Sequence, residues 1–249
     1  GLFKFDKKNF KYEPVTFKGK GTGGLLINKI IKSNTGKFLI GTNYGLMIYD
    51  VYKNEFQLAK IDIGNEYDYI NNSIQSMILA KDNSIWIGTF SSGLYKLNEN
   101  DNGVFSIKHF KISEKRILSL TEKINGNILC GTENDGLFEY IQKSGEIKNY
   151  TYNRLNSDGL KSNSIWTVYN DDKDRIWIGY YNKGIDVYDD SQVRSLKEMK
   201  HIRVNISLTL LDLHENDDKK MPEINMRTLD EDRCKYCIDI LIIHLDIFV

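Results

Sequence analysis

A short apolar pattern that ends in glycine occurs four times along this 249-residue chain, at nearly even intervals. In every copy an isoleucine stands fourteen residues before the glycine, and a second glycine follows within four or five residues. The first glycines are Gly41, Gly88, Gly131 and Gly179, and the isoleucines are Ile27, Ile74, Ile117 and Ile165. Fixed offsets that recur at intervals of 47, 43 and 48 residues indicate a repeat architecture, in which each copy forms one structural unit.

The copy around Gly88 reads as four short strands joined by turns: Ser73–Leu79, Ile85–Thr89, Leu94–Asn98 and Val104–Phe110. Its second strand starts with Ile-Trp-Ile, which is apolar on both faces, so both faces have to be covered. Four strands in about 40–50 residues is typical of a β-propeller blade, and we predict an all-β propeller of stacked four-stranded blades. A two-sheet sandwich is the alternative, but sandwich strands do not repeat their glycines at fixed offsets.

The chain opens in the middle of a repeat, because Gly1-Leu2 with Phe5-Asp6 matches Gly45-Leu46 with Tyr49-Asp50. We therefore expect about four and a half blades, which make an incomplete ring. The expected units are a partial blade at 1–18 and full blades at about 24–64, 71–111, 115–152 and 163–195. The repeats thus occupy about residues 1–190, and residues 191–249 form an atypical tail.

The tail departs from the repeat but keeps some apolar patterning. Alternation with polar residues predicts a strand, which could be the innermost strand of a fifth full blade; the alternating residues are Ile202, Val204, Ile206, Leu208 and Leu210. Residues 238–249 are apolar but too short and too polar to span a bilayer, so we expect a terminal strand there. The alternative is a mispredicted end. An arc that the tail leaves open would expose apolar faces, and we expect such an arc to associate with itself.

Both glycines of a repeat have a structural explanation. The first ends a strand where neighbouring blades crowd together, so that a side chain does not fit. The second, such as Gly93, lies in a short turn that requires a positive φ angle. Trp86 and Trp177 lie on the doubly apolar second strand and are expected in the core. One further aromatic position recurs and is expected to pack between sheets: Tyr49, Tyr140 and Tyr188.

Composition and motifs exclude several classes of function. The 34 basic residues balance 34 acidic ones, which argues against a strongly basic nucleic-acid-binding protein. Cys234 and Cys237 form a Cys-x-x-Cys, but a structural zinc needs two more ligands, so we expect no metal and no cofactor. His214-Glu215 lacks the rest of a phosphoacceptor box, and neither nucleotide-binding glycines nor a Ser/His/Asp set can be assembled. We therefore expect no catalytic activity from this chain.

Two segments resemble a known repeat. Ser73–Met77 followed by Asn83–Thr89 and Gly93-Leu94 resembles the two-component regulator propeller repeat. Asn163–Val168 followed by Asp174–Gly179 resembles it as well. The Trp-Ile-Gly-Thr core with a following Gly-Leu is specific to this repeat type, and the resemblance extends over about residues 1–190. The sequence departs from the pattern at Leu39 and Leu129, where Trp is usual, and at Tyr180, where Thr is usual.

The resemblance implies a periplasmic sensor region, because propellers of this family precede a transmembrane helix and a histidine kinase, often a hybrid one. It implies a seven-bladed ring, with the remaining blades and the membrane kinase region as partners. It also implies the sensing of glycan fragments, with a monosaccharide or oligosaccharide as ligand, in Bacteroidetes-type bacteria. A protein-binding propeller scaffold is the alternative, and a propeller lyase or glycoside hydrolase is a further one.

Aromatic residues that do not recur among the repeats are the candidates for ligand binding. Aromatic rings on loops can stack on sugar rings, and propellers usually bind at the loop face and the central channel. The candidates in the turns after the second strands are Tyr44, Phe90, Tyr180, Tyr181 and Asn182. Tyr67 and Tyr69, in the long loop before Ile74, complete the set.

Overall fold

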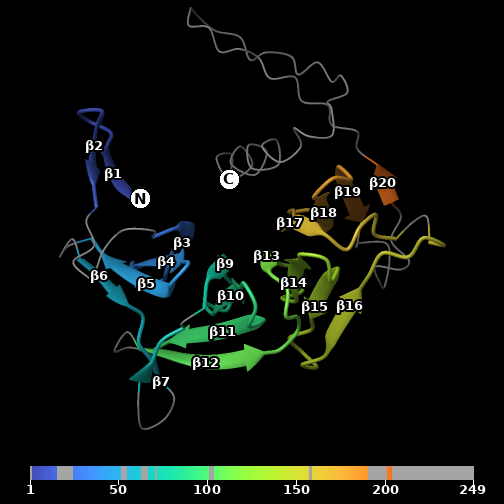
Figure 1. The fold of residues 1–249 in the computed structure, drawn as a ribbon, viewed down its shortest axis with the longest axis horizontal. Helices are drawn as coiled ribbons and strands as arrows, with labels where there is room; N and C mark the ends of the chain where they lie inside the picture. The colour runs from blue at the N-terminus through green and yellow to red at the C-terminus, as the bar shows by residue number, and fades with distance from the viewer. Residues whose placement is uncertain are drawn as a thin grey trace, which may run out of the picture.

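The computed structural model describes residues 2–15, 25–51, 55–62, 67–70, 72–100, 104–156, 159–189 and 201–203. Their regular secondary structure consists of β-strands, and none of these residues belongs to a helix long and apolar enough to cross a membrane. Four sheets stand side by side in an arc, each with its innermost strand toward the centre (Figure 1). The predicted all-β propeller of four-stranded blades is confirmed.

We number the blades in chain order, and in each the strands run antiparallel from the inside outward. The first blade comprises β3 (Ile27–Lys32), β4 (Phe38–Thr42), β5 (Gly45–Asp50) and β6 (Glu55–Leu58). The second comprises β9 (Ile74–Leu79), β10 (Ile85–Thr89), β11 (Leu94–Glu99) and β12 (Phe105–Phe110). The third comprises β13 (Ile117–Glu122), β14 (Ile128–Thr132), β15 (Leu137–Tyr140) and β16 (Ile147–Tyr150). The fourth comprises β17 (Ile165–Asn170), β18 (Arg175–Tyr180), β19 (Ile185–Asp189) and β20 (His201–Arg203).

Two short pairs of strands flank this arrangement. β7 (Ile61–Asp62) and β8 (Tyr67–Asp68) extend the outer edge of the second blade, where β7 pairs in parallel with β12. β1 (Phe3–Asp6) and β2 (Lys11–Pro14) form an N-terminal hairpin at one end of the arc (Figure 1). Leu2 and Val15, at the base of this hairpin, pack against Ile40 and Met47 of the first blade. The hairpin therefore packs on the face of the first blade that points away from the second.

In the first three blades a glycine contacts an isoleucine of the next blade. A Cβ atom added to Gly41 would lie 2.6 Å from Cγ2 of Ile74, far inside contact distance. The corresponding distances are 2.6 Å from Gly88 to Cγ2 of Ile117 and 2.8 Å from Gly131 to Cγ2 of Ile165. Because any side chain would collide there, the prediction that the first glycines mark crowding between blades is confirmed at these three positions.

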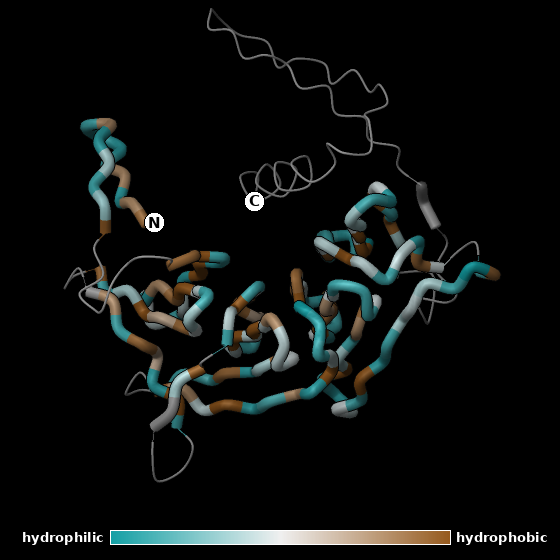
Figure 2. Tube along the Cα trace, in the orientation of Figure 1, coloured by the Kyte–Doolittle hydropathy of each residue, from teal (hydrophilic) through white to brown (hydrophobic). Residues whose placement is uncertain are grey.

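The second strand of the second blade packs apolar residues against both neighbours. Ile85 and Ile87 join the core that the second blade shares with the first. Trp86 lies between them in sequence and joins the core shared with the third blade, where its ring meets Phe110 and Tyr140 at 5.6 and 5.2 Å between centroids. Hydrophobic stretches, brown in Figure 2, accordingly occur in every blade and in the N-terminal hairpin. The doubly apolar strand is thus covered on both sides, as the sequence predicts.

Two predictions are corrected by the structure. Trp177 was expected in the core beside Trp86, but it is only half-buried, because the described residues contain no blade beyond the fourth one. Ile202 lies in a strand, as predicted, but this strand is β20, the outermost of the fourth blade, and not the innermost of a fifth, which the sequence offered as an option. Alternation of apolar residues identifies a strand and carries no information on its place within the sheet. The other alternating residues of the tail, and residues 238–249, lie outside the described part of the chain.

A buried charged pair stabilises the third blade. Nζ of Lys123 lies 3.3 Å from Oε1 of Glu139, and both side chains are less than a tenth exposed. Asn127 donates to Oε1 at 2.7 Å, and the Tyr150 hydroxyl donates to Oε2 at 3.0 Å. Burial by itself would raise the pKa of the Glu139 carboxyl, but these hydrogen bonds and the charge of Lys123 outweigh it and hold the pKa below its usual value.

Replacing Trp86 by alanine should lower the free energy of unfolding by about 3–5 kcal/mol, because it empties a fully buried site between two blades. Trp177→Ala is the matched control at the equivalent position, and we expect less than about half of that loss because its ring is partly exposed. Urea melts of dilute protein measure both values. Equal losses would show that the two rings are covered to the same extent.

The Glu139 carboxyl should stabilise the fold only while it is ionised. Because its folded pKa lies below the usual 4.5, the unfolded chain binds more protons as the pH falls. Its contribution is therefore complete above about pH 4.5 and disappears as the pH drops through the folded pKa. Glu139→Gln should flatten this acid dependence in urea melts between about pH 6 and pH 3. A variant with the acid dependence of the wild type would contradict the assignment.

Candidate functional site

The turn after each second strand is tied to the start of the innermost strand of the same blade. In each blade a backbone N–H just after the second strand donates to a carbonyl just before the innermost strand. The bonds run from Asn43 to Leu26 (3.1 Å), Phe90 to Ser73 (2.8 Å), Glu133 to Arg116 (2.9 Å) and Tyr181 to Ser164 (3.2 Å). We call these eight residues, together with the rest of the turns at 43–45, 90–93, 133–136 and 181–184, the turn face.

A buried threonine fixes this turn in three blades. Thr42, Thr89 and Thr132 each donate from Oγ1 to the carbonyl of the second glycine of the repeat, at 2.8, 2.8 and 2.7 Å. Positive φ angles at these glycines, such as 77° at Gly93, complete the turn as predicted. The Gly-Thr pair of the repeat therefore combines a close contact between blades with a cap for the turn.

Tyr180 replaces the threonine in the fourth blade, and its predicted place on an accessible loop was wrong. It is the last residue of β18 and is fully buried. Its hydroxyl accepts a hydrogen bond from the backbone N–H of Lys161 at 3.2 Å and lies 3.5 Å from the Tyr188 hydroxyl. Burial raises the pKa of this phenol. The large ring thus fills the space beneath the turn and does not face a ligand.

The other predicted aromatic residues differ in where they lie. Tyr44, Phe90 and Tyr181 belong to the turn face and are 55%, 42% and 53% exposed, and Asn182 is exposed beside Tyr181. Tyr69 is 38% exposed but follows β8, at the outer edge of the second blade. Tyr67 lies within β8, and its side chain is outside the described part of the structure. The predicted residues of the turns therefore lie together at one end of the blades, whereas Tyr67 and Tyr69 lie in or beside β8.

Two residues were not predicted from the sequence: Arg116, which belongs to the turn face, and Trp166, which contacts it. The guanidinium carbon of Arg116 lies 4.3 Å from the ring centroid of Phe90, so a cation–π contact joins the second and third blades. Arg116 also brings Nε to 3.4 Å from Oε2 of Glu133. Trp166 stacks on Tyr181 with 5.2 Å between ring centroids and 29° between planes. The turn face thus carries two ordered contacts, in which the Phe90 ring packs on a guanidinium group and the Tyr181 ring stacks on an indole ring.

A bulge in each innermost strand explains the place of Trp166. The pairing of the first and second strands skips one residue in all four blades, between Ile165 and Thr167 in the fourth. The skipped residues are Asn28, Gln75, Leu118 and Trp166. Such bulges redirect a side chain and are frequent next to binding sites. In the sequence the bulge is hidden, because the offset from isoleucine to glycine is the same in every repeat.

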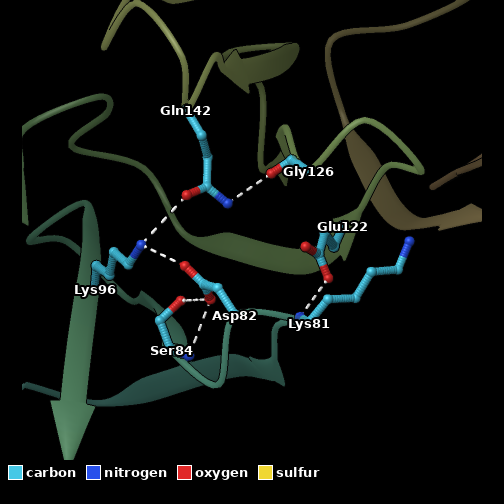
Figure 3. A network of polar contacts seen from close by, with 7 residues as sticks. All are labelled: Lys81, Asp82, Ser84, Lys96, Glu122, Gly126 and Gln142. Carbon is cyan, nitrogen blue, oxygen red and sulfur yellow. Dashed lines mark hydrogen bonds and ion pairs between the residues drawn. The ribbon is translucent and has the colours of Figure 1, made fainter.

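The opposite end of the second and third blades carries a polar network of a different kind (Figure 3). Nζ of Lys96 contacts Oδ2 of Asp82 at 2.8 Å and Oε1 of Gln142 at 3.3 Å, and Gln142 donates onward to the carbonyl of Gly126 at 2.7 Å. Although partial burial opposes it, hydrogen bonds from Lys96 and Ser84 hold the pKa of the Asp82 carboxyl below its usual value. Because its groups bind one another across the two blades, we interpret this network as a structural contact.

The described residues offer no group of three or more His, Cys, Asp or Glu side chains that could hold a metal ion. Cys130 is a buried free thiol whose pKa is raised by burial, which disfavours the reactive thiolate. Cys234 and Cys237 lie outside the described part of the chain.

Comparison with known proteins identifies the repeat. The family described as "Two component regulator propeller" matches residues 68–91 and 159–182. The first match contains the second strand of the second blade, and the other contains that of the fourth. Histidine kinase P4 from Formosa agariphila is 26% identical over 164 residues, which are 62% of this chain and 12% of the kinase. The sequence resemblance to two-component regulator propellers is therefore confirmed.

Solved structures share the fold. The extracellular domain of a hybrid two-component system from B. thetaiotaomicron has a TM-score of 0.60 at 22% identity, over 75% of this chain and 24% of that one. A protein of unknown function from Bacteroides caccae has a TM-score of 0.51 at 12% identity, over 82% of this chain and 69% of that one. The chain thus spans about an eighth of the kinase and about a quarter of the two-component system's domain.

Thr89→Val should destabilise the protein by about 1–3 kcal/mol, because it removes the buried hydroxyl that donates to the Gly93 carbonyl. The same change at Thr151, which is exposed, should alter the free energy of unfolding by less than about 0.5 kcal/mol. Urea melts compare the two variants. If Thr89→Val proved as mild as Thr151→Val, the threonine would not be what holds the turn.

Proposed function

We propose that this chain, a propeller built from two-component regulator repeats, senses glycan fragments on its turn face. The observation that carries the proposal is the pair of ordered contacts on that face, Trp166 with Tyr181 and Phe90 with Arg116. In the whole protein we expect the propeller on the extracellular or periplasmic side of the membrane, joined to further blades and to a histidine kinase region. Related two-component systems, whose extracellular domain shares this fold, support that arrangement.

The chemistry of the turn face suits a neutral, hydroxyl-rich ligand. Flat aromatic rings offer apolar surface to the C–H face of a sugar ring and lose little conformational entropy when they bind. Tyr181 leaves about half of its surface exposed while Trp166 fixes the orientation of its ring. On the same face, Arg116, Glu133 and Asn182 supply donors and acceptors for hydroxyl groups. Formal net charge of zero gives no preference for a nucleic acid.

Binding is a better interpretation of this face than hydrolysis. A glycosidase needs two carboxyl groups that flank the scissile bond. Glu133 and Asp135 come from one turn, and each is engaged by a neighbour: Arg116 approaches Glu133, and the Ser113 hydroxyl donates to Asp135 at 2.6 Å. Both carboxylates are therefore held by neighbouring side chains, which favours a sensor without catalysis of its own.

A glycan array probed with the purified chain tests the proposal. Titration calorimetry then measures the affinity for any glycan that binds. Trp166→Ala and Arg116→Ala should each weaken binding by about tenfold or more, which corresponds to about 1.4 kcal/mol. Ile124→Ala is the control, because Ile124 is 51% exposed in the turn between β13 and β14, at the opposite end of the third blade. An array without ligands would favour a protein-binding scaffold. Binding that is lost only with Ile124→Ala would place the site on the opposite end of the blades.

A further inference from the structure

The skipped residue of the second blade, Gln75, has a backbone that both neighbouring blades hold in place. The carbonyl of Ile74, just before it, accepts a hydrogen bond from Nδ2 of Asn28 in the first blade at 2.7 Å. Ser76, just after it, donates from Oγ to the carbonyl of Ile117 in the third blade at 2.8 Å. Because the second blade stands between two described blades (Figure 1), both junctions that fix Gln75 lie inside the arc.

The side chains of Gln75 and Asn28 each use only the nitrogen of the amide group within the protein. Nε2 of Gln75 donates to Oγ of Ser73 at 2.8 Å, and Nδ2 of Asn28 donates to the Ile74 carbonyl. A carbonyl can only accept, so the nitrogen of Asn28 has to face Ile74 and the oxygen faces elsewhere. In the part of the chain that the structure describes, neither Oε1 of Gln75 nor Oδ1 of Asn28 receives a hydrogen bond. Both oxygens are therefore oriented acceptors that lack a donor.

Two hydrogen bonds connect the Gln75 amide to the Phe90 turn of the turn face. Ser73, whose hydroxyl binds Gln75, also accepts at its carbonyl from the backbone N–H of Phe90 at 2.8 Å. The ring of Phe90 is 42% exposed, and the guanidinium of Arg116 packs on it. The acceptor oxygens thus belong to the same connected group of residues as an exposed aromatic ring.

We propose that Gln75 and Asn28 form a subsite for the free hydroxyl groups of a neutral glycan, next to the Phe90 turn. The inference rests on glycan sensing by the turn face and states which chemical groups of a glycan that face selects. A sugar hydroxyl can donate to a carbonyl oxygen, whereas an O-methyl group or a carboxylate has no hydrogen to donate. Acceptors that are already oriented lose little freedom on binding. The subsite therefore favours unsubstituted sugars over methylated or anionic ones.

An array of neutral hexose oligosaccharides, each also present in its O-methylated form, tests the subsite with the full chain. The wild type should bind the free-hydroxyl form at least about tenfold more tightly, because O-methylation removes every donor. Gln75→Leu keeps the approximate size of the side chain but lacks the acceptor, and should weaken binding of the free-hydroxyl form by about fivefold to tenfold. Gln75→Glu keeps an acceptor oxygen to which Ser73 can also donate, and should stay within about twofold of the wild type.

Gln57→Leu is the matched control, because it makes the same exchange at an exposed position of β6, the outermost strand of the first blade. It should bind like the wild type, and urea melts show whether each variant is folded. If Gln75→Leu bound as tightly as Gln57→Leu, or O-methylated glycans as tightly as free ones, the subsite would be refuted while glycan sensing stood. A Gln75→Glu chain as weak as Gln75→Leu would overturn the acceptor role. An array on which no glycan binds would overturn the sensing itself and the subsite with it.

Discussion

The contact between a glycine of one blade and an isoleucine of the next is the constraint on which the arrangement of the blades depends. At Gly88 the space that a Cβ atom would need is already taken by Ile117, and Gly41 and Gly131 show the same relation to Ile74 and Ile165. Dispersion forces between two sheets are strong only at contact distance, so this close approach lets the larger apolar side chains around it meet. Because the same pair recurs at each junction, the blades follow one another at a constant spacing and form an arc (Figure 1).

The turn face follows from that arrangement. In three blades the threonine after the glycine caps the turn, and in all four a backbone hydrogen bond ties the turn to the start of the innermost strand, so every blade presents a similar short segment at the same end. Residues within this segment are unlike from blade to blade: Phe90 and Arg116 meet across a junction, while Tyr181 stacks on Trp166 within one blade. A uniform backbone thus carries a varied set of side chains, which is what a recognition surface needs.

The sequence predicts the repeated features well and the individual ones poorly. Gly88, Thr89 and Trp86 stand at fixed offsets, so strand order, crowding and burial could be predicted from them. Trp177 has the same sequence context as Trp86, but burial also depends on the next blade, which lies outside the local pattern. Tyr180 takes a threonine's position and turns inward, because its hydroxyl finds partners beneath the turn. Part of the candidate site was missed because Arg116 contacts Phe90 across 26 positions of sequence, a pairing that only the folded blades create.

The single extra residue in each innermost strand has a consequence for how such a surface can change. In a regular strand a substitution alternates between the two faces of the sheet, and on either face it would disturb the fit of adjacent blades. The skipped residue takes no part in that alternation, so asparagine, glutamine, leucine and tryptophan all occupy it here beside an otherwise similar framework. The side chain at the skipped position can therefore vary while the pairing of the two strands stays the same.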